Sequence, residues 1–112
     1  MEVRAVTKYI HMTPQKMRLV ADLVRGADVT TALDLLKFTP KAAAQAVRGT
    51  LASAVANAEE NYGLAPDDLY VSTIMVDEGP TQRRFRAGAR GRAKPILKRS
   101  SHLTVIVAEK EA

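Results

Sequence analysis

A run of basic residues in the last third of the sequence is the feature most suited to binding chemistry. It holds eight cations and no acid between residues 81 and 101, namely Arg83, Arg84, Arg86, Arg90, Arg92, Lys94, Lys98 and Arg99. Arginine presents a planar fork of donors that matches two phosphate oxygens at once, and it stays charged at neutral pH. Because an ordinary surface mixes both signs of charge, this run predicts a polyanionic partner such as a nucleic acid.

Acidic residues gather in a different part of the chain. Residues 49–80 contain no base, although the formal net charge of the whole chain is +5. They hold six acids, namely Glu59, Glu60, Asp67, Asp68, Asp77 and Glu78. Paired carboxylates could serve acid–base or magnesium chemistry, but this signal is weak without a histidine, lysine or serine in the same constellation. We favour a solvated acidic face that repels RNA and orients docking.

The histidines and the glycine-rich stretch give little support to a metal or a cofactor. His11 and His102 lie far apart without the spacing of metal ligands, and the chain has no cysteine. We expect His102 to hydrogen-bond at the start of a strand or to touch RNA. Residues 88–91 lack the strand-to-helix context and the Gly-Lys-Ser/Thr ending of a nucleotide-binding loop. We expect no cofactor and no bound metal, and an enzyme is the least supported class.

The composition is that of a small globular domain. The chain has 112 residues, of which 46% are hydrophobic, and a chain of this size buries roughly two-thirds of its unfolded surface on folding. No apolar run approaches the roughly 18 residues of a membrane span, and the first residues lack the pattern of a secretory signal. We expect one domain, located in the cytoplasm, with no membrane partner and no homo-oligomer.

Start and stop signals predict two short helices in the first part of the chain. Thr13-Pro14 offers a hydroxyl N-cap followed by a proline at the first helical position, and Gly26 ends this helix. A second helix begins at Asp28 or Thr30 and carries an apolar stripe.

A third, longer helix is predicted between Thr39-Pro40 and Gly63. Pro40 pushes the preceding residue out of the helical region, so the second helix cannot pass Thr39. The Thr-Pro pair repeats the first start signal, and Gly63 is suited to the left-handed C′ position. The predicted buried face of this helix comprises Ala43, Val47, Leu51, Ala54, Val55, Ala58 and Tyr62.

Three strands complete an α+β fold. Leu69–Val76 and His102–Val107 are rich in β-branched residues, and residues 1–10 give a weaker strand signal. We expect a small three-stranded antiparallel sheet packed on three helices. The intervening residues 79–101 have too few large apolar side chains to form a core, and a connection this long in a small domain is functional or disordered.

This connection is predicted to form a long protruding basic β-hairpin. Two arms of about ten residues, at roughly 3.3 Å per residue, would project some 30 Å beyond the body. Phe85 on one arm could contact Ile96 and Leu97 on the other, and Gly88 and Gly91 bracket a plausible turn.

The first helix offers a second group of cations. Lys16, Arg18 and Arg25 could contact a nucleic acid or lie in solvent, and for Arg25 we weigh the two equally. Arg18 and Asp22 stand four residues apart, so they could instead form a helix-surface ion pair of little consequence.

Four stretches of the sequence carry a resemblance to a known family. They are MTPQKMRLVADLVRG, ALDLLKFTPKAAAQAV, SAVANAEENYGL and DDLYVSTIMVDEGPTQRRFRAGARGRAKPILKRSSHLTVIV. Together they cover essentially the whole chain, which resembles the family of ribosomal large-subunit protein twenty-two of the bacterial type. The most specific spacing runs from Arg90 to Val105.

The resemblance implies a structural protein of the large ribosomal subunit. Its body would bind large-subunit (23S-type) rRNA and support subunit assembly, and its hairpin would line the nascent-polypeptide exit tunnel. The implied partners are large-subunit rRNA, neighbouring large-subunit ribosomal proteins and the nascent polypeptide. The implied rRNA contacts are Lys16, Arg18, Arg83, Arg84, Arg86, Arg90, Arg92, Lys94, Lys98 and Arg99.

The tip of the hairpin departs from the family pattern. The residues that match the tunnel-facing tip are Ala87, Gly88, Ala89, Arg90 and Gly91. Where the family usually reads Pro-Arg-Ala-Arg-Gly-Arg, this chain reads Ala-Gly-Ala-Arg-Gly-Arg. The tip therefore lacks a proline and a cation.

Two hypotheses from other classes compete with the ribosomal one. A free-standing architectural DNA-binding protein would also carry a basic arm, and duplex DNA would then displace the RNA. A metal-dependent nuclease would use carboxylates such as Asp77 and Glu78, and it would cleave nucleic acid only with magnesium present.

Overall fold

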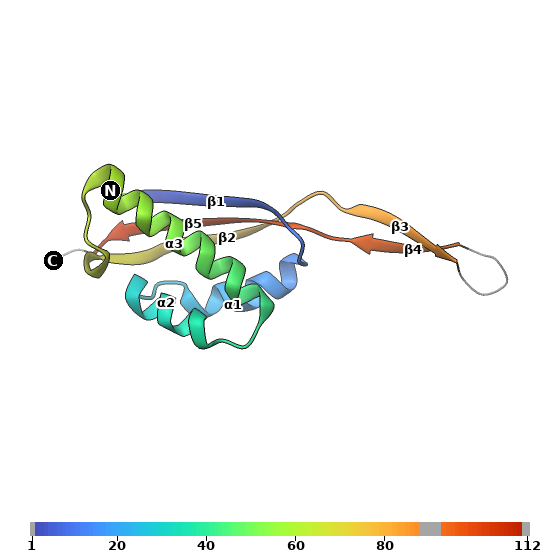
Figure 1. Cartoon of the computed structure of the whole chain (residues 1–112), viewed down its shortest axis with the longest axis horizontal. Helices are drawn as coiled ribbons and strands as arrows, with labels where there is room; N and C mark the ends of the chain where they lie inside the picture. The colour runs from blue at the N-terminus through green and yellow to red at the C-terminus, as the bar shows by residue number, and fades with distance from the viewer. Residues whose placement is uncertain (1, 88–92, 111–112) are drawn as a thin grey trace.

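Three strands from distant parts of the chain pair into one antiparallel sheet, in the order β1-β5-β2. They are β1 (Glu2–Ile10), β2 (Leu69–Glu78) and β5 (Ser101–Glu109), and Figure 1 shows them side by side. The structure is a computed structural model that describes the backbone of residues 2–87 and 93–110. Side chains are described outside residues 82–97 within these ranges.

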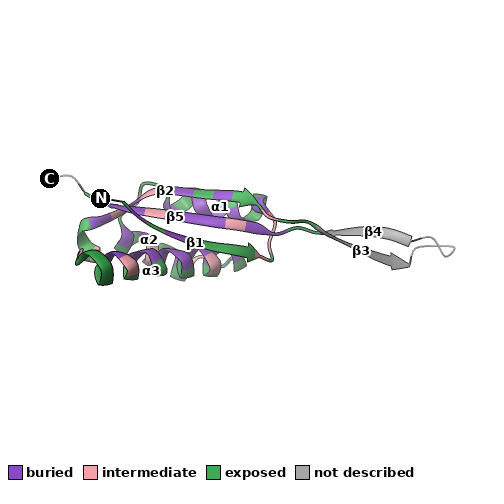
Figure 2. Cartoon of the chain, turned by 90° about the horizontal axis from the view of Figure 1, so that it is seen from above, coloured by how far each residue is buried: buried purple, intermediate pink, exposed green. Residues whose placement is uncertain are grey.

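Three helices cover one face of the sheet (Figure 2). They are α1 (Pro14–Val24), α2 (Val29–Phe38) and α3 (Ala42–Tyr62), and a short 3-10 turn, η1 (Pro66–Asp68), leads into β2. The predicted α+β architecture is thereby confirmed. None of the helices in the described ranges combines the length and the apolar character needed to cross a membrane.

The core lies between the helices and the covered face of the sheet. The largest side chains with almost no exposed surface come from every layer, namely Met17, Val20, Val24, Val29, Val47, Leu51, Leu69, Val71, Leu103, Val105 and Val107. Burying such side chains contributes about 1.5–3 kcal/mol each relative to leaving them exposed. This core fixes the body from which the basic segment extends.

The helix ends agree with the predicted signals except at Thr39. Gly63 follows α3 in the left-handed conformation with φ 65°, and Thr13 occupies the N-cap position of α1, although its hydroxyl caps no backbone group. Thr39 does not open α3, because its Oγ1 donates to the Leu35 carbonyl oxygen over 2.6 Å and so closes α2. Helix α3 begins later, after Lys41.

The small side chains of α3 lie against β1 and the centre of the sheet. Thr50 Oγ1 is 2.7 Å from Thr7 Oγ1, so a direct hydrogen bond joins α3 to β1. The predicted stripe is buried from Ala43 to Ala58, but the assignment of Tyr62 to it is wrong, since 52% of that residue is exposed. Tyr62 is the last helical residue, at the edge of the body, where the chain turns away.

The connection between β2 and β5 continues outward as a two-stranded hairpin. Strands β3 (Gln82–Ala87) and β4 (Ala93–Lys98) pair antiparallel, and Figure 1 shows them extending from the body along its long axis. The described chain measures 66 × 25 × 18 Å along its principal axes. The described part of the predicted hairpin is therefore present.

The backbone register of the hairpin does not place Phe85 directly opposite Ile96 or Leu97, and the contacts predicted for its side chain lie outside the described side chains. Phe85 is paired with Pro95, while Ile96 and Leu97 are paired with Arg84 and Arg83. A two-stranded ribbon accepts a proline because each strand has a free edge. The turn predicted at Gly88 and Gly91 lies outside the described residues.

Candidate nucleic-acid interface

A groove of about 880 Å³ lies where the hairpin leaves the body. We call it the root groove. Its apolar lining comprises Met12, Leu19, Ala42 and Ala43, and its polar lining comprises His11, Thr13, Lys16, Lys41, Lys98 and Arg99. Among the described residues that line it there are four permanent cations and no acid, so the groove presents a positive field.

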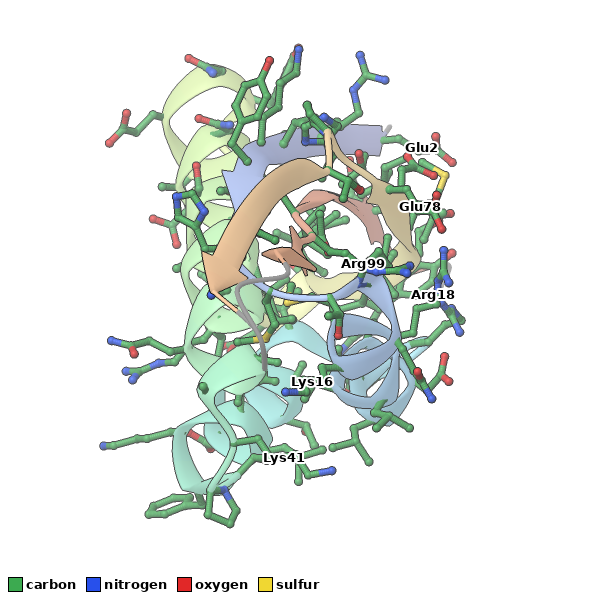
Figure 3. All side chains as sticks on the ribbon, turned by 90° about the vertical axis from the view of Figure 1, so that its right-hand side faces the viewer. Glu2, Lys16, Arg18, Lys41, Glu78 and Arg99 are labelled. Atoms are coloured by element: carbon green, nitrogen blue, oxygen red, sulfur yellow. The ribbon has the colours of Figure 1, made fainter. Side chains whose placement is uncertain are left out.

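Three separate elements bring these cations together. Lys16 stands in the first turn of α1, Lys41 is the N-cap residue of α3, and Lys98 and Arg99 lie where β4 leads into β5. In the end-on view of Figure 3, Lys16 and Lys41 lie below the hairpin and Arg99 lies above them. Lys16, Lys41, Lys98 and Arg99 are all exposed, which leaves their charges available to a ligand.

The first turns of two helices add to the positive field of the root groove. Neither Thr13 nor Lys41 caps its helix with a side-chain hydrogen bond. The first turns of α1 and α3, which contribute residues to the groove lining, therefore lack a side-chain cap on their backbone N–H groups. Such groups carry partial positive charge and favour anions.

Lys41 and His11 extend the site beyond the residues predicted from the sequence. A signal for Lys41 was present, because each Thr-Pro pair is followed within two residues by a lysine. Lys16, after the first pair, was predicted as an RNA contact, whereas the second pair was interpreted as a helix start alone. Their spatial convergence depends on how α1 and α3 pack, which the local pattern does not reveal.

Arg18 lies outside the root groove and has a structural hydrogen bond. Its Nη2 donates to the Val76 carbonyl oxygen over 3.0 Å, which ties α1 to β2. Figure 3 places Arg18 on the same side as Glu78, away from Lys16 and Lys41. Lys16 and Arg18, which were both predicted as RNA contacts, therefore lie in different places: Lys16 lines the root groove and Arg18 does not.

Asp22 pairs with Arg25 and not with Arg18, so the alternative pairing considered for Arg18 is wrong. The Arg25 Nη1 atom contacts Asp22 Oδ1, and its Nη2 donates to the Ile74 carbonyl oxygen over 2.9 Å. Arg25 therefore serves, like Arg18, to attach α1 to the edge of the sheet.

The hairpin cations occupy the strands that extend from the root groove. Arg83, Arg84 and Arg86 belong to β3, and Lys94 belongs to β4, where it is paired with Arg86. Like charges directly opposite one another destabilise a strand pair unless an anion lies between or beside them. The remaining predicted positions, Gly88, Ala89, Arg90, Gly91 and Arg92, lie outside the described residues.

The carboxylates that could have formed a catalytic or metal site are far apart. Asp67 and Asp68 lie in η1 at one end of β2, and Asp77 and Glu78 lie at the other end. A strand of this length spans about 30 Å. Within the described residues, no group of three metal-type side chains converges.

Hydrogen bonds fix the direction in which the hairpin leaves the body. The Gly79 N–H donates to the Ser100 carbonyl oxygen over 2.9 Å, and Ser100 Oγ donates to the Pro80 carbonyl oxygen over 2.7 Å. Ser101 Oγ donates to the Met12 carbonyl oxygen, also over 2.7 Å. His102 accepts a hydrogen bond from the Tyr9 N–H at the start of β5, which confirms the first of its two predicted roles.

Comparisons with known proteins show the family of this chain. The profile of the family described as "Ribosomal protein L22p/L17e" matches residues 5–108. A "Large ribosomal subunit protein uL22" from Halothermothrix orenii is 51% identical over 111 residues, which cover 99% of this chain and 98% of that protein. Proteins of the same name from Syntrophobacter fumaroxidans and Herpetosiphon aurantiacus are 54% and 52% identical, and the alignments cover 98% and 99% of this chain and 100% and 98% of theirs. The chain therefore belongs to the ribosomal protein L22p/L17e family, and it is a structural protein of the ribosome and not an enzyme.

Proposed function

We propose that this protein binds large-subunit rRNA through the root groove and the hairpin, as a constituent of the large ribosomal subunit in the cytoplasm. The main support for this proposal is that positive charge continues from the root groove into the hairpin. Four cations from three elements line the root groove, and the basic hairpin begins at its edge. The relatives carry large-subunit names, which supports this placement.

The mechanism is electrostatic and geometric. The body docks with its root groove against phosphates, and the hairpin passes between RNA segments that would otherwise repel each other. Arg86 and Lys94 are backbone partners in the register of β3 and β4, and an RNA phosphate beside the ribbon would offset the repulsion expected of two like charges at such a pair. By joining distant segments the protein supports subunit assembly. Neighbouring large-subunit proteins are further partners.

We infer from the resemblance and the length of the hairpin that its end reaches the nascent-polypeptide exit tunnel. The tip residues are Ala87, Gly88, Ala89, Arg90 and Gly91. Because the hairpin projects from a body that is bound to the rRNA, its end can reach a cavity distant from that body. The nascent polypeptide would then pass small side chains and one cation.

A salt series tests the RNA contact. Binding to large-subunit rRNA is measured for the intact protein, for Arg83→Ala/Arg84→Ala/Arg86→Ala, and for Lys41→Ala. Each lost phosphate contact should flatten the slope of log affinity against log salt by about 0.7–0.9. The triple variant should lose about two to three such contacts, and Lys41→Ala about one.

Lys37→Ala is the matched control for Lys41→Ala. Lys37 is also exposed, but it lies at the end of α2 and not in the root groove. Its replacement should leave the slope unchanged. Equal effects of the two lysines, or efficient displacement of the RNA by duplex DNA, would reject the proposed interface and favour a general polyanion-binding arm.

A further inference from the structure

An exposed tyrosine beside the root groove has an unusual backbone conformation. Tyr9 is the second-last residue of β1 and has φ 59°. Among the described residues it is the one non-glycine with a positive φ. The left-handed region is costly for residues with a Cβ atom, and glycine would occupy it without strain. Strained residues of this kind gather at functional sites. A tyrosine at this position, where glycine would avoid the strain, therefore indicates that the aromatic ring has a function.

The surrounding residues fix the ring without covering it. The register of β1 against β5 shifts between Thr7 and Ile10, which places Tyr9 in an irregular segment. The Tyr9 N–H donates to His102 Nδ1 over 3.1 Å, and the two rings meet edge to face with their centroids 5.0 Å apart. Even so, 60% of Tyr9 remains exposed. The ring is thus oriented in advance and still accessible.

A hollow of about 230 Å³ lies next to the ring. It is lined by Tyr9, His11, Pro80, Lys98 and Ser100. A depression of this size has room for several water-sized groups. His11 and Lys98 also line the root groove, so the two depressions adjoin.

We propose that Tyr9 and this hollow form a stacking site for one unpaired base of the rRNA. RNA is read mainly where bases are splayed out and can stack on aromatic side chains. The base would lie against the Tyr9 ring and Pro80, with Lys98 at an adjoining phosphate. This inference rests on the proposed function, and it adds a contact with a base to an interface otherwise built from contacts with phosphates.

Single-tryptophan variants give a direct readout, because the natural sequence contains no tryptophan. Tyr9→Trp is titrated with large-subunit rRNA and excited at the red edge, where RNA absorbs little. Stacking should quench most of its emission. Tyr62→Trp is the matched control, since Tyr62 is 52% exposed at the end of α3, away from the hairpin, and its emission should change little.

Two further variants separate the ring from the fold. Tyr9→Gly accepts the positive φ and removes the ring, and Tyr9→Phe retains the ring. Loss of one stacked base should lower rRNA affinity about 5- to 150-fold at fixed salt. Tyr9→Gly should show this loss with an unchanged salt slope and an unchanged urea midpoint, and Tyr9→Phe should stay within about twofold of the natural protein.

The outcomes distinguish this inference from the proposed function. If the natural protein binds rRNA with a steep, DNA-resistant salt dependence while Tyr9→Gly binds equally well, the stacking site is rejected and the rRNA interface stands. Emission of Tyr9→Trp that is unaffected by bound rRNA rejects it in the same way. If the natural protein does not prefer rRNA to duplex DNA, the proposed function fails, and the stacking site fails with it.

Discussion

Among the glycines in the described part of the chain, Gly79 is the one at which an added Cβ atom would meet other atoms within 4 Å. A Cβ atom at this position would lie 2.5 Å from Ser100 Oγ and 3.2 Å from His102 Cε1. The Ser100 hydroxyl cannot move freely, because it donates to the Pro80 carbonyl oxygen. Gly79→Ala should therefore disturb the root of the hairpin and destabilise the fold by about 1–3 kcal/mol in urea unfolding.

Gly49→Ala is the control for this prediction. Gly49 lies within α3, and a Cβ atom there would meet nothing within 4 Å. Alanine should stabilise the helix by about 0.5–1 kcal/mol because it loses less conformational freedom on folding. If Gly79→Ala and Gly49→Ala change the unfolding stability in the same direction, crowding at the root of the hairpin does not explain the effect of Gly79→Ala.

At the scale of single residues, the positions of the charges were predictable from the sequence, but not all of their partners were. Lys16, Lys98 and Arg99 were predicted as RNA contacts, and they line one groove. The role of Arg18 as a clamp on Val76 was not predicted, since the partner is a backbone carbonyl oxygen 58 positions away in the sequence. The same applies to Gly79, whose constraint comes from the Ser100 hydroxyl across the strand pair.

At the scale of elements, α3 shows how small side chains fix the distance between helix and sheet. Ala54 is fully buried, whereas Ala52 on the same helix is exposed. Ala54→Leu should force the helix away from the sheet and cost about 1–3 kcal/mol in urea unfolding. Ala52→Leu introduces the same side chain on the solvent side and should stay within about 0.5 kcal/mol. A similar loss of stability in both variants would mean that helix propensity, and not packing against the sheet, determines the effect.

Elements were predictable where a local signal marks them. Gly63 and the β-branched runs identified α3, β2 and β5 with shifts of one or two residues, because caps and periodicity act over a few positions. Thr39 was misassigned, since one hydroxyl can serve the end of one helix or the start of the next. The register of β3 against β4 depends on the whole ribbon, so the residue opposite Phe85 could not be identified from the local pattern, and the contacts proposed for its side chain stay a prediction.

At the scale of the whole molecule, positive charge lies at the root groove and hairpin while four acids lie at the opposite end. Glu59 and Glu60 belong to the last turn of α3, and Asp67 and Asp68 to η1. Figure 1 shows these elements at the end that holds both termini. Such a charge distribution orients the protein as it approaches a polyanion. The acidic end is therefore expected to prevent docking in the reverse direction.

Reversing the charge of the acidic end tests this orientation effect. Glu59→Lys/Glu60→Lys should stabilise the fold by about 0.3–1 kcal/mol per site, because cations interact favourably with a helix C-terminus. The same variant should bind duplex DNA on the order of tenfold more tightly and lose selectivity for rRNA, since either end could then meet phosphates. The control is Asp77→Lys/Glu78→Lys, which makes the same charge change at the hairpin end of β2. It should strengthen binding to both nucleic acids while the ratio of their affinities is kept. If both variants change that ratio equally, net charge and not its placement determines how the protein docks.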